Sequence, residues 1–142
     1  MKEEGYQLLE CLAVCLFLTV LFGVGGISLS RSLDRYRLET SAKGLAAELG
    51  ALRIAAVSRK APLSVFISDC RSQYGFGLRK ESPVALRSLR TGVCFANHPK
   101  RPLTFYSRGN AVPAGSYLLS SAAGQCKVVV APTGRIRCEY LD

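Results

Sequence analysis

A run of nineteen residues without a charged side chain, residues 11–29 with the sequence CLAVCLFLTVLFGVGGISL, constrains this chain more than any other feature. A helix rises about 1.5 Å per residue, so the run would extend about 28 Å as a helix. That length is close to the hydrocarbon core of a bilayer, which is about 30 Å thick. The run therefore predicts a membrane helix near the N-terminus.

A secretory signal peptide is the alternative for this run, with Ser28-Leu29-Ser30 as a small-residue cleavage site. That interpretation leaves Glu10 unexplained, one residue before the apolar run. A carboxylate at this position is expensive in lipid and usually serves a function. We therefore favour the membrane helix over the signal peptide.

The segment Gly5-Tyr6-Gln7-Leu8-Leu9-Glu10, followed directly by the apolar run, resembles the class III leader of type IV pilins and type II secretion pseudopilins. In that family a membrane peptidase cuts after the glycine and methylates the new N-terminus. The resemblance implies cleavage after Gly5, Tyr6 as the first mature residue and Glu10 as the acid at the fifth mature position. The new amine and the Glu10 carboxylate can neutralise each other between neighbouring subunits, which would set the register of assembly.

A second helical pattern follows the apolar run. Apolar residues recur at steps of four and three along one stripe: Leu38, Ala42, Leu45, Leu49, Leu52 and Ala56. We expect one long helix to about residue 58, softened at Gly23, Gly25 and Gly26, with Pro62 marking its end. The stripe predicts a core face against a sheet, and helix–helix packing in a filament is the alternative use.

From residue 63 onward, short β-prone runs alternate with turn residues. The expected strands cover residues 63–68, 74–80, 84–90, 103–106, 116–121, 125–131 and 135–141. A long helix followed by a run of strands predicts an α+β fold in which the helix packs on an antiparallel β-sheet region.

The order of these segments resembles the GspH/FimT branch of the pilin family. The residues that carry the resemblance are Leu103-Thr104-Phe105, Arg108-Gly109-Asn110, Pro113-Ala114-Gly115 and the stretch VVVAPTGRIR at 128–137. The expected domains are a leader at 1–5, the transmembrane part of the helix at 6–29, its amphipathic part at 30–60 and an exported β-rich domain at 61–142.

The six cysteines fall into two groups. Cys11 and Cys15 lie one turn apart in the apolar run and are expected to be small apolar fillers, with lipidation or an intersubunit contact as the alternative. The other four, Cys70, Cys94, Cys126 and Cys138, lie in the β region. Four thiols in an exported domain predict two disulfides, whereas a single histidine and the lack of a CxxC spacing argue against zinc.

Three disulfide connectivities are possible among the four cysteines of the β region. The turn Ala131-Pro132-Thr133-Gly134 has the type I pattern, with Pro second and Gly fourth. Counting outward from this turn places Cys126 and Cys138 on one face, either opposite or one step diagonal. This favours Cys126–Cys138 with Cys70–Cys94, although a diagonal pair would strain the bond.

The chain has a strong basic excess, with 19 Lys and Arg against 10 Asp and Glu, and residues 61–142 hold eleven against four. Arg135 and Arg137 alternate with Ile136, so both guanidinium groups leave one face of the hairpin, and Lys127 shares that face by parity. Three cations on a rigid hairpin predict a phosphate platform, and a solvated surface is the alternative.

The Gly-Arg-x-Arg sequence at 134–137 also resembles the motif through which FimT-type minor pilins bind DNA in natural transformation. The resemblance implies DNA binding by Arg135 and Arg137. Further candidate contacts near the central turns are Lys100, Arg101 and Arg108.

No catalytic centre is indicated by the sequence. His98 has no acid or nucleophile near it in the chain and is expected to be a surface or capping residue. There is no glycine-rich phosphate loop, nucleophile elbow or pair of catalytic carboxylates, so we expect neither enzyme activity nor a cofactor nor a metal.

We therefore interpret the chain as a GspH/FimT-type subunit of a filament assembled at the inner membrane. The expected partners are other pilin or pseudopilin subunits, the prepilin peptidase, the inner membrane and DNA. The protein would be single-pass, with its C-terminal domain in the periplasm or on the filament. The alternatives are a type II secretion minor pseudopilin with a purely structural role at the filament tip, and an unrelated signal-anchored periplasmic domain.

Overall fold

The structure, a computed structural model, describes residues 3–77 and 85–141, with the backbone alone for residues 3–5, 24–28 and 85. It falls into two compact units, Met1–Leu33 and Asp34–Asp142. One helix, α1 (Glu3–Arg59), supplies the described part of the first unit and continues into the second.

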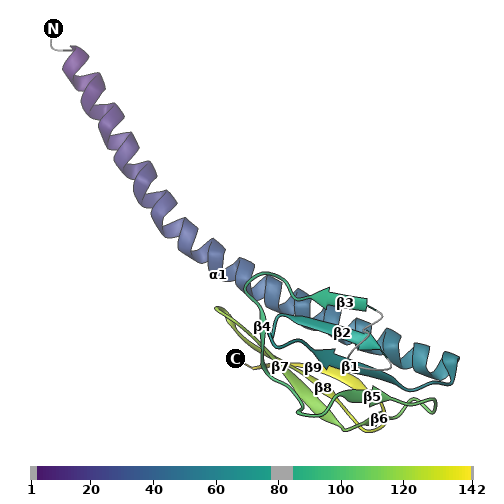
Figure 1. The fold of residues 1–142 in the computed structure, drawn as a ribbon. Coiled ribbons are helices and arrows are strands. Elements are labelled where there is room, and N and C mark those ends of the chain that lie inside the picture. Colours follow the sequence, from purple (N-terminus) through teal and green to yellow (C-terminus); the bar gives the residue numbers. More distant parts are fainter. Residues whose placement is uncertain (1–2, 78–84, 142) are drawn as a thin grey trace. The chain divides into compact units, whose positions relative to one another are not determined.

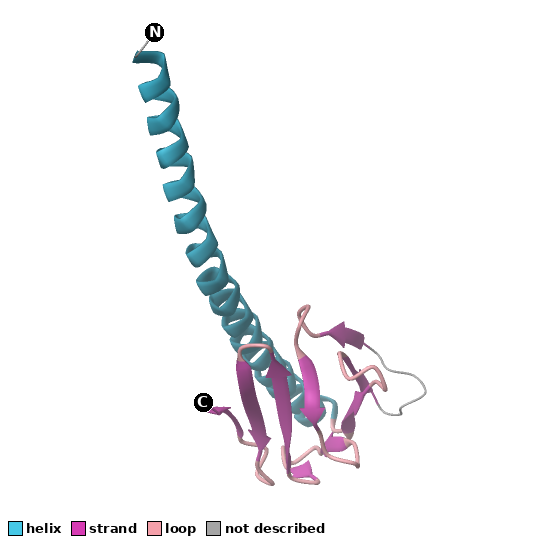
Figure 2. Ribbon diagram, turned by 90° about the vertical axis from the view of Figure 1, so that its left-hand side faces the viewer, coloured by secondary structure: helices cyan, strands magenta, loops and turns pink. Residues whose placement is uncertain are grey.

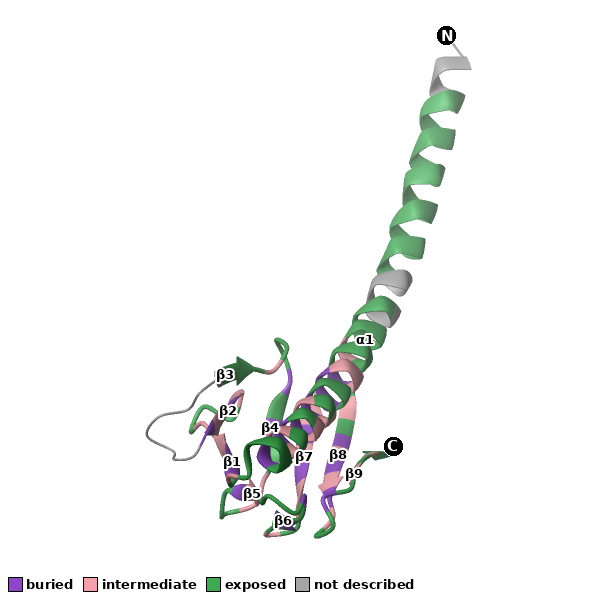
Figure 3. Ribbon diagram, turned by 90° about the vertical axis from the view of Figure 1, so that its right-hand side faces the viewer, coloured by how far each residue is buried: buried purple, intermediate pink, exposed green. Residues whose placement is uncertain are grey.

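The first unit contains a helical segment with the properties of a membrane span. Over Tyr6–Gly23, 18 residues of α1 have a mean hydropathy of 1.9, and none of them is buried. Figure 3 shows this segment as exposed along its length. By length and composition the segment can cross a membrane, as the apolar run predicts.

In the second unit, α1 ends in two hydrogen bonds that form a Schellman motif. The Lys60 N–H donates to the Val57 carbonyl, the Ala61 N–H donates to the Ala56 carbonyl, and Lys60 has a φ of 51°. Pro62 follows at once and has no N–H with which to continue the helix. The helix therefore ends within one residue of the position expected from the sequence.

Two antiparallel sheets follow the helix. The first has the order β3-β2-β1-β5-β6, with β1 (Leu63–Ile67), β2 (Gln73–Gly77), β3 (Ala85–Ser88), β5 (Leu103–Phe105) and β6 (Ala111–Val112). The second has the order β4-β7-β8-β9, with β4 (Cys94–Asn97), β7 (Gly115–Ser121), β8 (Gly124–Val130) and β9 (Ile136–Leu141). Figures 1 and 2 show both sheets beside the part of α1 that belongs to this unit. The predicted α+β fold class is confirmed.

Strands β4 and β6 were not expected from the sequence. β4 has only four residues, of which Phe95 alone is buried, and its pairing with β7 is interrupted between Phe95 and Asn97. β6 has two residues. Neither is long enough to show the alternation that marks a strand. The expected strands at 74–80 and 84–90 also include residues 78–80 and 84, which lie outside the described residues.

The core forms where the stripe of α1 meets the inner faces of both sheets. All six stripe residues are buried, and they join one cluster with large residues from the two sheets, among them Leu103, Phe105, Leu119 and Val128. Three aromatic rings extend this core: Phe95 makes edge contacts with Tyr74 of β2 at 6.0 Å and with Tyr117 of β7 at 6.1 Å. The prediction that the stripe is a core face is confirmed.

Candidate nucleic-acid interface

The β8–β9 hairpin carries the arginines predicted to bind DNA. Its turn is closed by the Gly134 N–H donating to the Ala131 carbonyl and the Ala131 N–H donating to the Arg135 carbonyl, both at 2.9 Å. Gly134 has a φ of 77°, which is the left-handed glycine of a type I turn with a bulge. The turn expected from the sequence is therefore present, and its bulge sets the register of the two strands.

That register places the basic side chains on one face, as predicted by parity. Val129 is paired with Arg137, and Lys127 is paired with Glu139. The alternate residues of β8, Cys126, Val128 and Val130, are buried, so Lys127 and Arg137 lie on the opposite, outer face. Arg135 and Arg137 are exposed, and neither forms an ion pair with any residue that the structure describes.

Lys127 contributes less to this face than the sequence suggested. It is half-buried, and the carboxylate-bearing Glu139 is its direct neighbour on β9. A carboxylate next to a lysine offsets its charge toward a polyanion. The exposed positive charges of the hairpin are therefore those of Arg135 and Arg137.

A third arginine, Arg53 of α1, holds this hairpin in place. Its Nε donates to the Gly109 carbonyl at 2.9 Å, and its Nη2 donates to the Thr133 carbonyl at 3.2 Å. The Ala111 N–H also donates to the Pro132 carbonyl at 3.0 Å. These bonds join the turn of the second sheet to the β5–β6 turn of the first, and both turns to α1.

Gly134 belongs to the same junction. A Cβ at this position would collide with the Gly109 carbonyl oxygen and would lie 2.6 Å from Arg53 Nε. The glycine of the Gly-Arg-x-Arg sequence is thus required by the packing of two turns. The junction also brings the exposed Arg108, next to Gly109, to the same end of the domain as Arg135.

Lys100 and Arg101 lie elsewhere. They line a cavity of about 430 Å³ between the end of β1, the β4–β5 loop and Tyr117 of β7, together with Arg71 and His98. The residues predicted to bind DNA therefore separate into a hairpin group and a cavity group. Arg53 and Arg71 were not identified from the sequence, because their roles depend on contacts with segments distant in the chain.

Solved structures of known proteins share this architecture. The type IV minor pilin FimU of Pseudomonas aeruginosa matches in two crystal forms, with TM-scores of 0.63 and 0.60 at 21% sequence identity. The first match covers 75% of this chain and 90% of the FimU chain. The minor pseudopilin EpsH from the type 2 secretion system of Vibrio cholerae matches with a TM-score of 0.59 at 16% identity, over 73% of this chain and 97% of that chain.

This chain has the fold of a minor pilin. The fold expected from the resemblance to the GspH/FimT branch is confirmed. No model of a protein family matches the sequence, and no curated protein matches it. This chain therefore resembles FimU and EpsH in structure, although the sequence identity is low.

The residues expected to form the leader and its cleavage site lie at the start of α1. Gly5 is helical, and the side chains of Tyr6 and Glu10 are exposed, Tyr6 by 76%. Met1 and Lys2 of the expected leader lie outside the described residues. Cys11 and Cys15 are also exposed on this part of the helix.

The disulfide prediction is not supported, because all six cysteines are free thiols in the structure. Cys126 is paired with Tyr140, and Cys138 is paired with Val128, so the two cysteines share a face but lie on a diagonal. Burial raises the pKa of the Cys126 thiol to about 11, and the Cys138 Sγ lies 3.8 Å from the Ala42 carbonyl oxygen. The diagonal arises because the bulge at Gly134 shifts the register.

Cys70 and Cys94 are both exposed, and their backbones lie side by side. The Phe95 N–H donates to the Arg71 carbonyl at 2.8 Å, which joins the residues that directly follow the two cysteines. Within the described part of the chain, no group of three or more His, Cys, Asp or Glu residues could hold a metal ion.

Proposed function

We propose that this chain is a GspH/FimT-type minor pilin that enters a filament at the inner membrane and binds DNA for uptake through its β8–β9 hairpin. The minor-pilin fold together with the exposed apolar span supports the filament role. The observation that carries DNA binding is the outer face of the hairpin. There Arg135 and Arg137 project without an acidic partner among the described residues.

The N-terminal segment would act in assembly. The prepilin peptidase would cut after Gly5 and methylate the amine of Tyr6, leaving Glu10 to pair with the N-terminal amine of a neighbouring subunit. An exposed carboxylate at the start of an apolar helix supports this pairing, since lipid solvates it poorly. Residues 61–142 would then be the exported domain, in the periplasm or on the filament.

Processing can be tested by the Gly5→Val variant. A branched side chain at the cleavage position should block the peptidase, so the variant should remain a precursor and stay out of filaments. Mass spectrometry of the mature N-terminus gives the readout, with Gly44→Ala as a matched control that should be cut normally. Cleavage of the parent after Ser30 would contradict the pilin interpretation.

DNA binding can be tested with the full-length protein in detergent micelles. Phosphate contacts should dominate the affinity, so binding should weaken with salt and show little sequence preference. The Arg135→Gln, Arg137→Gln double variant should bind more weakly and lower the salt slope by about two, because two phosphate contacts are lost. The fold should survive, because both side chains are exposed and Ile136 keeps its contact with the core.

Arg90→Gln is the matched control for that experiment. Arg90 is exposed and lies outside the hairpin. Arg87 is a poorer control, because its Nε lies 3.7 Å from Glu48 Oε1 and its replacement would remove an ion pair. The hairpin is not the DNA site if the double variant binds as tightly as the parent at low and moderate salt.

The likeness to EpsH supports a second candidate, a type II secretion minor pseudopilin with a structural role at the filament tip. This role predicts that the parent protein itself does not bind DNA at low salt. The DNA titration of the parent protein therefore distinguishes the two candidates.

We also propose a disulfide between Cys70 and Cys94 once the domain is in an oxidising compartment. Their exposure and the hydrogen bond between the adjoining Arg71 and Phe95 support this pair. Cys126–Cys138, the other pair favoured by the sequence, would have to close across a diagonal. Mass spectrometry of a non-reduced digest distinguishes the two pairs.

A further inference from the structure

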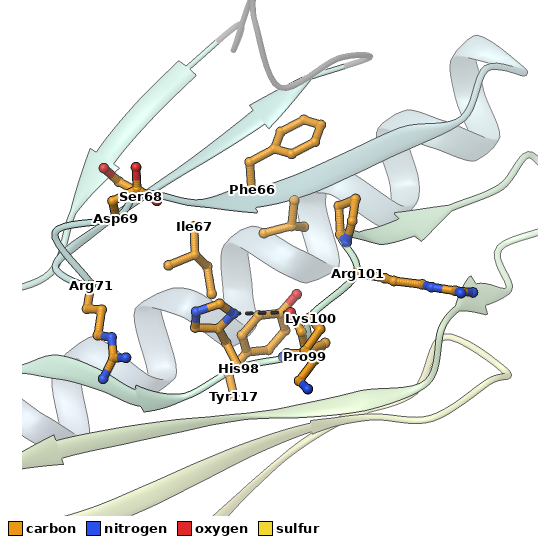
Figure 4. A pocket seen from close by; sticks show the side chains of 12 residues that line it. Phe66, Ile67, Ser68, Asp69, Arg71, His98, Pro99, Lys100, Arg101 and Tyr117 are labelled. Carbon is orange, nitrogen blue, oxygen red and sulfur yellow. Dashed lines mark hydrogen bonds between the residues drawn. The ribbon is translucent and has the colours of Figure 1, made fainter.

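A cavity at the junction of the two sheets lies outside the hairpin. It measures about 430 Å³, within the range of small-molecule sites, and is formed by the end of β1, the β1–β2 turn, the β4–β5 loop and β7. Figure 4 shows His98, Pro99, Lys100 and Tyr117 gathered below Ile67, with Arg71 at one end of the opening and Arg101 at the other.

The charge around this cavity is unbalanced. Arg71, Lys100 and Arg101 line it against one carboxylate, Asp69. None of the four forms an ion pair with another residue in the described part of the chain. These four side chains together carry two net positive charges, which matches in magnitude the charge of a phosphomonoester at neutral pH, close to −2.

The backbone at Arg71 has a conformation that is uncommon for arginine. Arg71 has a φ of 51°, in the left-handed region where glycine or asparagine is easier to place. Its N–H donates to the Ser68 carbonyl at 2.9 Å, which closes the turn. Strained residues of this kind concentrate at binding sites, where the conformation directs a side chain.

The lining also offers apolar surface and oriented polar groups. Ile67, Pro99, Pro102 and Tyr117 give it apolar walls. His98 Nδ1 lies 3.1 Å from the Pro99 carbonyl oxygen, so Nδ1–H is the donor in this contact. No described residue is a hydrogen-bond partner of the Ser68 or Tyr117 hydroxyl.

We propose that this cavity binds a nucleoside monophosphate unit, with the phosphate at Arg71 and the base against Ile67, Pro99 and His98. The unit can be a free nucleotide, whose phosphomonoester carries close to two negative charges, or one nucleotide of a single strand, whose phosphodiester carries one, since both present an anionic phosphate next to a ring. Cationic grooves with rings that stack on bases are the usual means of binding single strands. The site uses none of the hairpin residues, so it stands or falls independently of DNA binding by Arg135 and Arg137.

The first test titrates the full-length protein in micelles with dAMP, with deoxyadenosine and with inorganic phosphate, using calorimetry. We expect dAMP to bind at least tenfold more tightly than either fragment, because only dAMP engages both halves of the cavity. Arg71→Gln should weaken dAMP binding about tenfold through loss of a charge-assisted contact. Arg90→Gln, an exposed arginine outside the cavity, should bind as the parent does.

Arg71→Gly separates binding from folding. Glycine relieves the left-handed backbone, so this variant should keep or raise the melting temperature while losing dAMP affinity as Arg71→Gln does. If Arg71 served only the turn, Arg71→Gly would leave binding unchanged. That result would overturn the proposal, as would phosphate binding as tightly as dAMP or the absence of dAMP binding at millimolar concentration.

Competition then identifies the source of the nucleotide. In the Arg135→Gln, Arg137→Gln background, displacement of dAMP by a short oligo(dA) assigns the cavity to a single strand, and failure to displace assigns it to free nucleotides. Displacement by a glutamate-rich peptide at equal concentration would overturn the proposal in favour of an acidic protein partner. Failure of hairpin binding is recognised separately, because it leaves dAMP affinity unchanged.

Discussion

The hairpin and the cavity are both basic, yet they are built in different ways. The hairpin draws Arg137 from β9 and Arg135 from the position just before that strand, two residues apart in the chain. The cavity collects Arg71, His98 and Lys100 from two loops of different sheets. A cluster made of neighbours in the chain can be recognised in a sequence, whereas a cluster made across a fold cannot.

The two regions also differ in what holds them. The hairpin turn is held from outside, by Arg53 and by the close approach of Gly134 to Gly109. The cavity is held in place where the two sheets meet, by the hydrogen bond that the Phe95 N–H donates to the Arg71 carbonyl. Changes at the Arg53 junction should therefore affect the hairpin and leave the cavity intact.

The largest expected effect comes from Gly134→Ala. A methyl group there meets the Gly109 carbonyl and Arg53, and the φ of 77° is itself unfavourable for alanine. We expect a loss of about 3 kcal/mol or more in the free energy of unfolding, measured by urea denaturation. Gly44→Ala is the control: nothing lies within 4 Å of its Cβ position, and in this helical site alanine should add about 0.5–1 kcal/mol. Equal effects of the two substitutions would refute the turn-packing role of Gly134.

A smaller effect is expected from Arg53→Met, which keeps the apolar stem and removes the guanidinium. Two carbonyls, those of Gly109 and Thr133, lose a charged donor, which should cost about 1–2 kcal/mol in a site that is partly exposed. DNA binding by the hairpin should weaken, because α1 no longer holds its turn in place. The affinity of the cavity for dAMP should stay at the parental value. Arg90→Met is the matched control. A parallel loss of both activities would show that the two regions are not independent.

The smallest effect concerns the inner face of the hairpin, at Cys126. Burial raises the pKa of this thiol to about 11 from an ordinary value near 9, so the folded chain keeps a proton that the unfolded chain releases. The resulting stabilisation is complete below pH 9 and declines as the pH rises toward 11. In reducing buffer, unfolding measured between pH 8 and 10 should show this decline for the parent and a weaker one for Cys126→Ala. An identical slope for both proteins would mean that the thiol does not titrate with folding.

Local sequence patterns were sufficient to predict much of this fold. The uncharged run indicated a membrane span, steps of three and four indicated the buried stripe from Leu38 to Ala56, and Pro62 indicated the end of the helix. The alternation along the hairpin placed Lys127 and Arg137 on the outer face. Each of these signals lies within a few residues of chain, where helix and strand geometry alone determine which side chains share a face.

Tertiary structure decided what depends on distant partners. It separated Lys100 and Arg101 from the hairpin, brought Arg53 and Gly109 to its turn, divided the strands between two sheets and put Cys126 and Cys138 on a diagonal. The physical reason is that these features follow from the packing of loops and sheets against α1, where one bulge or one short strand changes the register. The sequence by itself therefore determined the elements and their faces, and only the packed fold determined which residues meet to form a site.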